Sequence, residues 1–128
     1  MLSDYDMSAT IPASDLARAK AFYSEKLGLE PTREVEFGGG YFYSTGSSEF
    51  LLYPSGFAGT NQATAASWRV NDIDGVVSGL KAGGVVFEEY DFEEFKTVDS
   101  IAKTPDGSRG AWFKDSEGNI LSVFQEQA

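Results

Sequence analysis

The stretch TIPASDLARAKAFYSEKLGL, residues 10–29, decides the fold. Residues up to Pro12 read as a short strand, and Asp15 offers a side-chain oxygen to the first free amides of a helix. Gly28 supplies the left-handed residue that ends a helix. Between them, apolar residues recur at helical spacing, which predicts an amphipathic helix with one buried face: Leu16, Ala19, Tyr23 and Leu27.

A weaker copy of this unit follows in the second half of the chain. A shift of 57 positions places Asp15 on Asp72 and Leu16 on Ile73. Strand-like runs follow the first helix at 31–37, 41–44 and 49–53, and the second at 85–95, 99–104, 109–114 and 120–125. We therefore expect an α+β protein with one domain, 1–128, made of a duplicated unit. Its modules cover about 5–54 and 65–128, and residues 55–64 form a linker.

Composition limits the possible partners. Ten Lys and Arg against twenty Asp and Glu give a net charge of −10. This field repels phosphate backbones and anionic lipids, so we expect no nucleic acid and no membrane as partner. A neutral or cationic small molecule is favoured instead. No apolar run approaches the roughly 20 residues of a membrane span, and residues 1–7 lack the pattern of a signal peptide, so we expect a cytoplasmic protein.

The chain contains no Cys and no His. These two absences exclude disulfides, thiolate nucleophiles and thiolate metal sites, and they remove the commonest metal ligand and general base.

Three groups of residues resemble the vicinal oxygen chelate superfamily. They are the helix motif of residues 14–29, the run Trp68-Arg69-Val70-Asn71-Asp72-Ile73, and Trp112-Phe113-Lys114-Asp115 with Gly118-Asn119. That superfamily includes glyoxalase I, extradiol dioxygenases, fosfomycin-resistance enzymes and bleomycin-resistance proteins. The resemblance implies two tandem βαβββ modules whose curled mixed sheet surrounds a cavity, often completed across a homodimer.

The resemblance also implies where a divalent metal sits in the enzymes of the superfamily. Its ligands come from the first and last strands of each module, which match Ser8, Ala65, Leu52 and Ser122 here, with Tyr53 as the alternative to Leu52 if the register shifts by one. Two hydroxyls and two hydrocarbon side chains do not supply the three or four donors that such a metal needs. We therefore expect no metal and no cofactor, and we assign no catalytic residue.

Because strand residues alternate between faces, the same positions mark the residues expected to line the cavity. By the same resemblance, Trp112 is expected to face the cavity, while Trp68 and Phe113 are expected beneath the helices. A lining of hydroxyls and aromatic rings suits an aromatic or cationic guest, although Trp112 and Phe124 are equally explained as core. The expected ligand pocket consists of Ser8, Thr10, Phe50, Leu52, Ala65, Ser67, Arg69, Trp112, Ser122 and Phe124.

The sequence leaves the roles of two charged features undecided. Arg69 either holds a ligand carboxylate or pairs with an acidic neighbour. The acidic stretch 88–94 is either a solvated strand edge or a negative rim that attracts a cationic ligand. Its acidic residues, which alternate with Tyr90, Phe92 and Phe95, are Glu88, Glu89, Asp91, Glu93 and Glu94.

The leading hypothesis is a metal-free protein that resembles the bleomycin-resistance branch and binds a small aromatic or cationic molecule without converting it. The first alternative is a lyase, isomerase or dioxygenase that uses a displaced metal, or a carboxylate base such as Glu88 or Glu89. The second alternative is a non-catalytic subunit that pairs with another protein.

Overall fold

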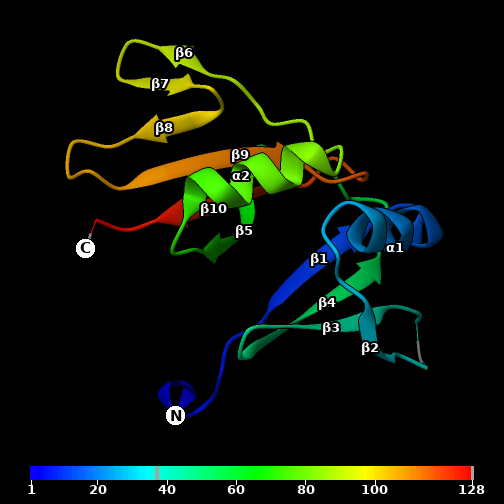
Figure 1. Ribbon diagram of the computed structural model, residues 1–128. Coiled ribbons are helices and arrows are strands. Elements are labelled where there is room, and N and C mark those ends of the chain that lie inside the picture. Colours follow the sequence, from blue (N-terminus) through cyan, green and yellow to red (C-terminus); the bar gives the residue numbers. More distant parts are fainter. Residues whose placement is uncertain (37, 128) are drawn as a thin grey trace.

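A computed structural model describes residues 1–36 and 38–127 and shows two modules side by side (Figure 1). A short 3-10 turn, η1 (Leu2–Asp4), precedes them. The first module contains β1 (Ala9–Ala13), α1 (Leu16–Glu25), β2 (Pro31–Glu34), β3 (Tyr41–Thr45) and β4 (Ser48–Pro54). The second contains β5 (Thr64–Arg69), α2 (Ile73–Ala82), β6 (Asp91–Phe92), β7 (Phe95–Val98), β8 (Ile101–Lys103), β9 (Arg109–Lys114) and β10 (Ile120–Gln125).

Both helices begin where their caps predict. Asp15 accepts a hydrogen bond from the Arg18 amide at 3.0 Å, and Asp72 accepts one from the Gly75 amide at 3.1 Å. Gly28 has φ +69°, the left-handed conformation expected after α1. In the part of the chain that the structure describes, no helix is long and apolar enough to cross a membrane.

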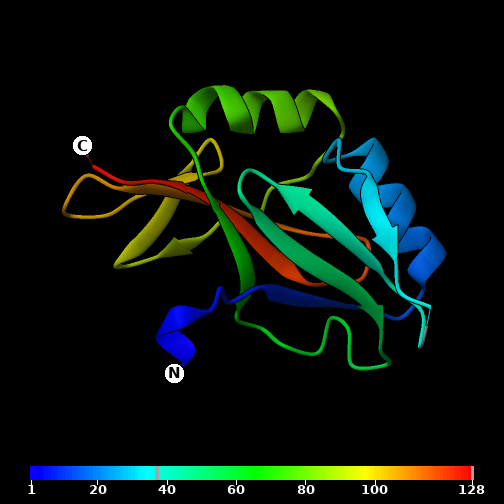
Figure 2. The ribbon, with the colours of Figure 1, turned by 90° about the horizontal axis from the view of Figure 1, so that it is seen from below.

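Each module forms its own sheet. The first sheet has the order β1-β4-β3-β2, and the second has the order β5-β10-β9-β8-β7-β6. The first and last strands of each module pair in parallel, and the remaining neighbours are antiparallel. Each helix covers one face of its own sheet (Figure 2). The edge strands β1 and β5 contact each other where the modules meet. Because first and last strands pair in parallel in both modules, the duplicated α+β fold is confirmed.

A single cluster of buried side chains runs through both modules. It includes Tyr23 from α1 and Tyr43 and Phe50 from the first sheet, whose two rings stack with centroids 5.0 Å apart. Phe87 and Phe113 extend the same cluster into the second module, where their rings meet edge to face at 5.4 Å. The modules therefore share apolar packing, as expected for one domain. The assignment of residues 1–128 to a single domain of two modules and a linker stays a prediction.

The region expected as one strand at 85–95 is different in the structure. Phe87 makes an isolated bridge to Phe113, and the chain then forms the separate hairpin of β6 and β7. The turn of this hairpin falls at Glu93-Glu94, where adjacent carboxylates repel each other and remain in solvent. Phe37, the expected end of the strand 31–37, and Ala128, the last residue of the second module, lie outside the described residues.

We predict that Gly59→Ala destabilises the fold. Gly59 lies in the linker at φ +76°, and a Cβ there would stand 2.5 Å from the Glu117 carbonyl oxygen. The left-handed conformation and the clash together cost about 1–3 kcal/mol of unfolding free energy, measured by urea denaturation. Gly56→Ala, in the same linker with open space around it, is the control and should change stability by less than about 0.5 kcal/mol. Equal effects of the two changes would contradict the role given to Gly59.

Candidate functional site

The strand register decides which side chains share the open face of the first sheet, away from α1. Thr10 is opposite Leu51, and Ile11 is opposite Leu52. Ile11 and Leu52 are 2% and 0% exposed and belong to the core, whereas Thr10 is exposed. The expected placement of Leu52, and of Phe50 two residues before it, on one face with Ser8 and Thr10 is therefore corrected. Leu51 takes that position, since partners in a ladder point to the same side.

The open face of the second sheet contains the residues expected there. Ser67 is opposite Ser122, and their hydroxyls form a hydrogen bond. Trp112 is opposite Ser122 on the other side, and its indole Nε1 donates to Thr64 Oγ1 at 3.1 Å. Phe95 packs edge to face on Trp112 with centroids 5.2 Å apart. Ala65, Arg69 and Phe124 alternate with core residues and complete this face.

The residues at the family's metal positions do not fit a metal. Ser122 pairs with Ser67, two residues after Ala65, and by the same register the position on β4 is Leu51. The four positions thus hold Ser8, Leu51, Ala65 and Ser122, and the Ser122 hydroxyl is already bonded to Ser67. Within residues 1–36 and 38–127, no group of three His, Cys, Asp or Glu side chains stands close enough to hold an ion. A donor set of two hydroxyls does not replace the hydration shell of a divalent cation.

A cavity of about 700 Å³ lies where the two modules meet, and we call it the intermodule cavity. Its apolar walls come from both modules: Ala9, Ile11, Tyr23, Leu27, Leu29, Phe50, Ala66, Trp68, Val70, Val76, Leu80, Phe113, Leu121 and Val123. Of the residues expected in a pocket, it contains Ser8, Phe50, Ser67 and Arg69. The remaining six, Thr10, Leu52, Ala65, Trp112, Ser122 and Phe124, are not among its lining residues. The structure therefore divides the expected set between this cavity, the open faces and the core.

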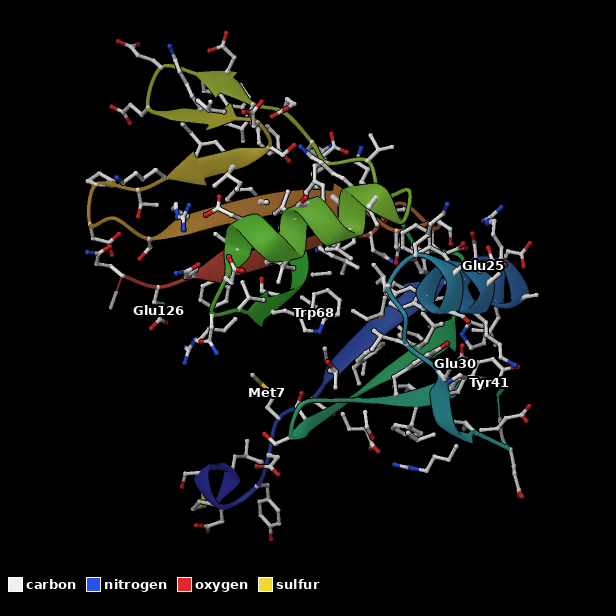
Figure 3. The ribbon with its side chains drawn as sticks, viewed as in Figure 1. Met7, Glu25, Glu30, Tyr41, Trp68 and Glu126 are labelled. Atoms are coloured by element: carbon white, nitrogen blue, oxygen red, sulfur yellow. The ribbon has the colours of Figure 1, made fainter. Side chains whose placement is uncertain are left out.

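Trp68 connects the two walls of the cavity. Its ring stacks on Phe113 at 6.5 Å, and its Nε1 donates to Thr45 Oγ1 in the first module at 3.1 Å. Figure 3 shows the ring between β5 and the first module. The expectation for Trp68, a position beneath the helix, does not include this contact with the first module. The available signal was the alternation of β5, where Ala66, Trp68 and Val70 form one apolar face.

The two charged residues of the lining are already paired. Glu49 accepts a hydrogen bond from the Arg33 guanidinium at 2.7 Å, and Arg69 lies 3.0 Å from a Glu126 carboxylate oxygen. The interpretation of Arg69 as the partner of an acidic neighbour is confirmed.

The acidic stretch does not reach the intermodule cavity, because neither Glu88 nor Glu89 is among its lining residues. Glu89 Oε1 instead accepts hydrogen bonds from the Thr97 hydroxyl at 2.7 Å and the Ser100 amide at 2.9 Å. Glu89 therefore orders the β7–β8 turn.

Comparison with known proteins identifies the family. The sequence model of the glyoxalase/bleomycin resistance protein/dioxygenase superfamily matches residues 7–123. The chain belongs to this superfamily. No curated protein matches the chain. Solved structures of other proteins show the same fold at low sequence identity.

Three of these structures illustrate how low the sequence identity is while the fold is retained. UcmS2 is 22% identical, with 94% of this chain and 98% of that chain covered and a TM-score of 0.73. Lactoylglutathione lyase from Agrobacterium tumefaciens is 20% identical, with 94% and 92% covered and a TM-score of 0.70. The fosfomycin resistance protein FosX from Listeria monocytogenes is 12% identical, with 96% and 93% covered and a TM-score of 0.70.

In this superfamily member, a buried carboxylate fixes the two walls of the cavity relative to each other. The side chain of Glu117, in the β9–β10 turn, is 0% exposed and pairs with Arg18 of α1 at 2.8 Å. It also accepts hydrogen bonds from the Asp15 amide at 2.9 Å and the Ser14 hydroxyl at 3.2 Å. Burial alone would raise the pKa of Glu117, but the bonds from Arg18, Ser116, Asp15 and Ser14 outweigh it and lower the pKa to about 2.

A second carboxylate in the same turn reinforces this contact. Asp115 accepts a hydrogen bond from the buried Tyr23 hydroxyl at 2.7 Å and another from the Asn119 amide group at 2.9 Å. Asn119 donates in turn to the Pro12 carbonyl at 2.7 Å. Burial and then the charge of Asp115 raise the pKa of Tyr23, so its hydroxyl remains a proton donor. We call Arg18, Tyr23, Asp115, Glu117 and Asn119 the module junction.

We predict that Glu117→Gln destabilises the protein by about 3 kcal/mol near neutral pH, because the buried side chain loses the negative charge to which Arg18, Ser14, Ser116 and the Asp15 amide donate. Glu126→Gln is the control: it removes a carboxylate of similar distance to Arg69 in an exposed pair, and should cost less than about 1 kcal/mol. Urea denaturation of both variants measures the difference.

The pH dependence gives an independent check. The folded pKa of Glu117, about 2, lies below its ordinary value of 4.5, so its stabilisation is complete above pH 4.5 and is lost as the pH falls toward 2. This loss amounts to roughly 3 kcal/mol. The unfolding free energy of Glu117→Gln should fall less steeply over that range. Parallel pH profiles of the two proteins would contradict the assignment.

Proposed function

We propose that the protein binds a small, largely apolar or aromatic molecule in the intermodule cavity, without a metal ion, and holds this molecule rather than converting it. The observation that carries the proposal is the cavity itself, whose apolar walls come from both modules. Ligand sites in proteins are typically apolar hollows of about 300–1,000 Å³ with a few polar groups. A cavity of about 700 Å³ with serine and threonine hydroxyls in its lining matches this description.

The composition of the family's metal positions supports binding without a metal. The superfamily contains both enzymes and resistance proteins, and the relatives described above include a lyase and a fosfomycin resistance protein. In this chain, Ser8, Leu51, Ala65 and Ser122 offer too few donors for metal-dependent chemistry. A role like that of the bleomycin-resistance proteins, in which a toxic small molecule is sequestered, therefore suits these residues better than a lyase or dioxygenase role.

The proposal is tested with N-phenyl-1-naphthylamine, a neutral aromatic probe that fluoresces in apolar sites. We expect it to bind in a saturable way with one equivalent per chain. Ala66→Phe, which places a ring inside the intermodule cavity, should weaken binding by about tenfold or more. Ala65→Phe is the matched control, since the neighbouring side chain lies on the open face, and it should leave the affinity unchanged.

Dialysis against a chelator should leave probe binding unchanged, and elemental analysis should find well under one equivalent of Zn, Mn, Fe or Ni. One equivalent of such a metal, or binding that Ala65→Phe abolishes and Ala66→Phe does not, would contradict the proposal. Catalytic turnover of a bound compound by the purified protein would favour the enzyme alternative.

We also propose that the protein is a homodimer. The supporting observation is the N-terminal arm, residues 1–8, which projects from the first module (Figure 1). Met1, Leu2, Tyr5 and Met7 in this arm are 92%, 84%, 74% and 97% exposed. Several large apolar side chains in one short exposed segment indicate a surface that another chain covers. The cytoplasmic location expected from the sequence stays a prediction.

We predict that the double change Leu2→Ser and Tyr5→Ser converts the dimer to a monomer or raises its dissociation constant by about tenfold or more. Size-exclusion chromatography with light scattering, over a range of concentrations, measures the change. Phe57→Ser is the control, because Phe57 is an exposed apolar residue of the linker outside the arm. A wild-type protein that is monomeric at all concentrations would contradict the proposal.

A further inference from the structure

The charges around the intermodule cavity are balanced before any ligand enters. Among the described lining residues, only Glu49 and Arg69 carry a charge. Each has a partner that does not itself line the cavity: Arg33 for Glu49 at 2.7 Å, and Glu126 for Arg69 at 3.0 Å. The cavity therefore offers no unpaired ion to a charged ligand.

The uncharged polar groups of the lining lie on a small part of the wall. They come from the β3–β4 turn and its two flanking residues, from the residue before β1, and from β5: Ser8, Thr45, Ser47, Ser48 and Ser67. Three of these are already engaged, since Thr45 accepts from Trp68, Ser67 is bonded to Ser122, and the Ser48 hydroxyl donates to the Thr45 carbonyl at 3.1 Å. The walls formed by α2 and by the residues after α1 are purely apolar, with Leu27, Leu29, Val76 and Leu80.

Burying a charged group in such a site is unfavourable. An ion that loses its hydration without gaining a counter-ion pays a desolvation cost of several kcal/mol. A cationic ligand would have to share Glu49 with Arg33, and an anionic one would have to share Arg69 with Glu126, so in each case the charge is already balanced by a neighbour. A net charge of −10 adds a long-range repulsion against anions.

We infer that the ligand of the intermodule cavity is electrically neutral, with an apolar ring or chain body between the helices and one hydrogen-bonding end, such as a hydroxyl, carbonyl or amide, at the β3–β4 turn. This inference rests on the proposed function and specifies its ligand class. It selects the neutral guest over the cationic one. The Ser47 hydroxyl at the turn and the Ser8 hydroxyl beside it supply a donor and an acceptor for one polar end, and the apolar walls supply the buried area.

A matched pair of probes tests the inference. N-phenyl-1-naphthylamine and 8-anilinonaphthalene-1-sulfonate share one ring skeleton and differ by the anionic sulfonate. We expect the neutral probe to bind about tenfold more tightly or better. The difference should persist in about 0.5 M NaCl, which screens the field of the whole protein but not a buried desolvation cost.

The outcomes separate this inference from the proposed function. If both probes bind with equal affinity and Ala66→Phe weakens both, the cavity binds ligands but the inference of neutrality is wrong. If the difference disappears in high salt, the long-range charge explains it and neutrality is again wrong. If neither probe binds, or Ala66→Phe has no effect on either, the proposed function itself fails and the inference fails with it.

A change of charge preference provides a second test. Arg33→Gln leaves Glu49 in the cavity wall without its partner, although Arg33 itself does not line the cavity. The variant should bind the cationic probe N-(1-naphthyl)ethylenediamine about fivefold more tightly than the wild type, with unchanged affinity for the neutral probe.

Lys103→Gln is the matched control, since it removes one positive charge at an exposed position on β8 that is not in the lining. An equal gain in both variants would show that net charge, rather than the freed Glu49, decides the preference. Strong binding of the cationic probe to the wild type would overturn the inference directly.

Discussion

The buried carboxylate of Glu117 is the contact on which the arrangement of the two modules depends. It belongs to the last turn of the second module, but its donors are Arg18, Ser14 and the Asp15 amide, at the start of the first helix. Asp15 therefore has two functions, because its side chain caps α1 and its amide binds Glu117. A residue that fixes where the first helix begins also fixes where the second module lies.

This junction explains why a cavity remains between modules that share one core. The junction closes the interface at the start of α1, and Trp68 closes it at the β3–β4 turn through Thr45. Between these two contacts, edge strands β1 and β5 lie near each other without pairing, because each is hydrogen bonded only to the last strand of its own module. Apolar side chains from both sheets then face a space that neither module fills alone.

The sequence predicted the ranges of the helices and strands more fully than it predicted which side of each sheet a strand residue faces. Capping aspartates and helical spacing placed both helices, and strands β9 and β10 match their expected ranges. In Phe50-Leu51-Leu52-Tyr53 every residue is apolar, so no alternation separates the two faces, and the expected register was shifted by one. The junction and the position of the cavity between the modules were not predictable, since they depend on contacts such as Arg18 to Glu117, 99 residues apart. The sequence left open that Arg69 pairs with an acidic residue. It did not identify the partner, because Glu126 lies at the other end of the module.

The two tryptophans lie on opposite sides of the second sheet. Trp68 faces the intermodule cavity, while Trp112 lies on the open face against Phe95. Their indoles are the two indole fluorophores of the chain, and each reports on a different surface. Emission from Trp68 follows events at the cavity, and emission from Trp112 follows events at the face where the superfamily's metal positions lie. With one of the two tryptophans replaced by Phe, light emitted by the other reports on its own surface without an added label.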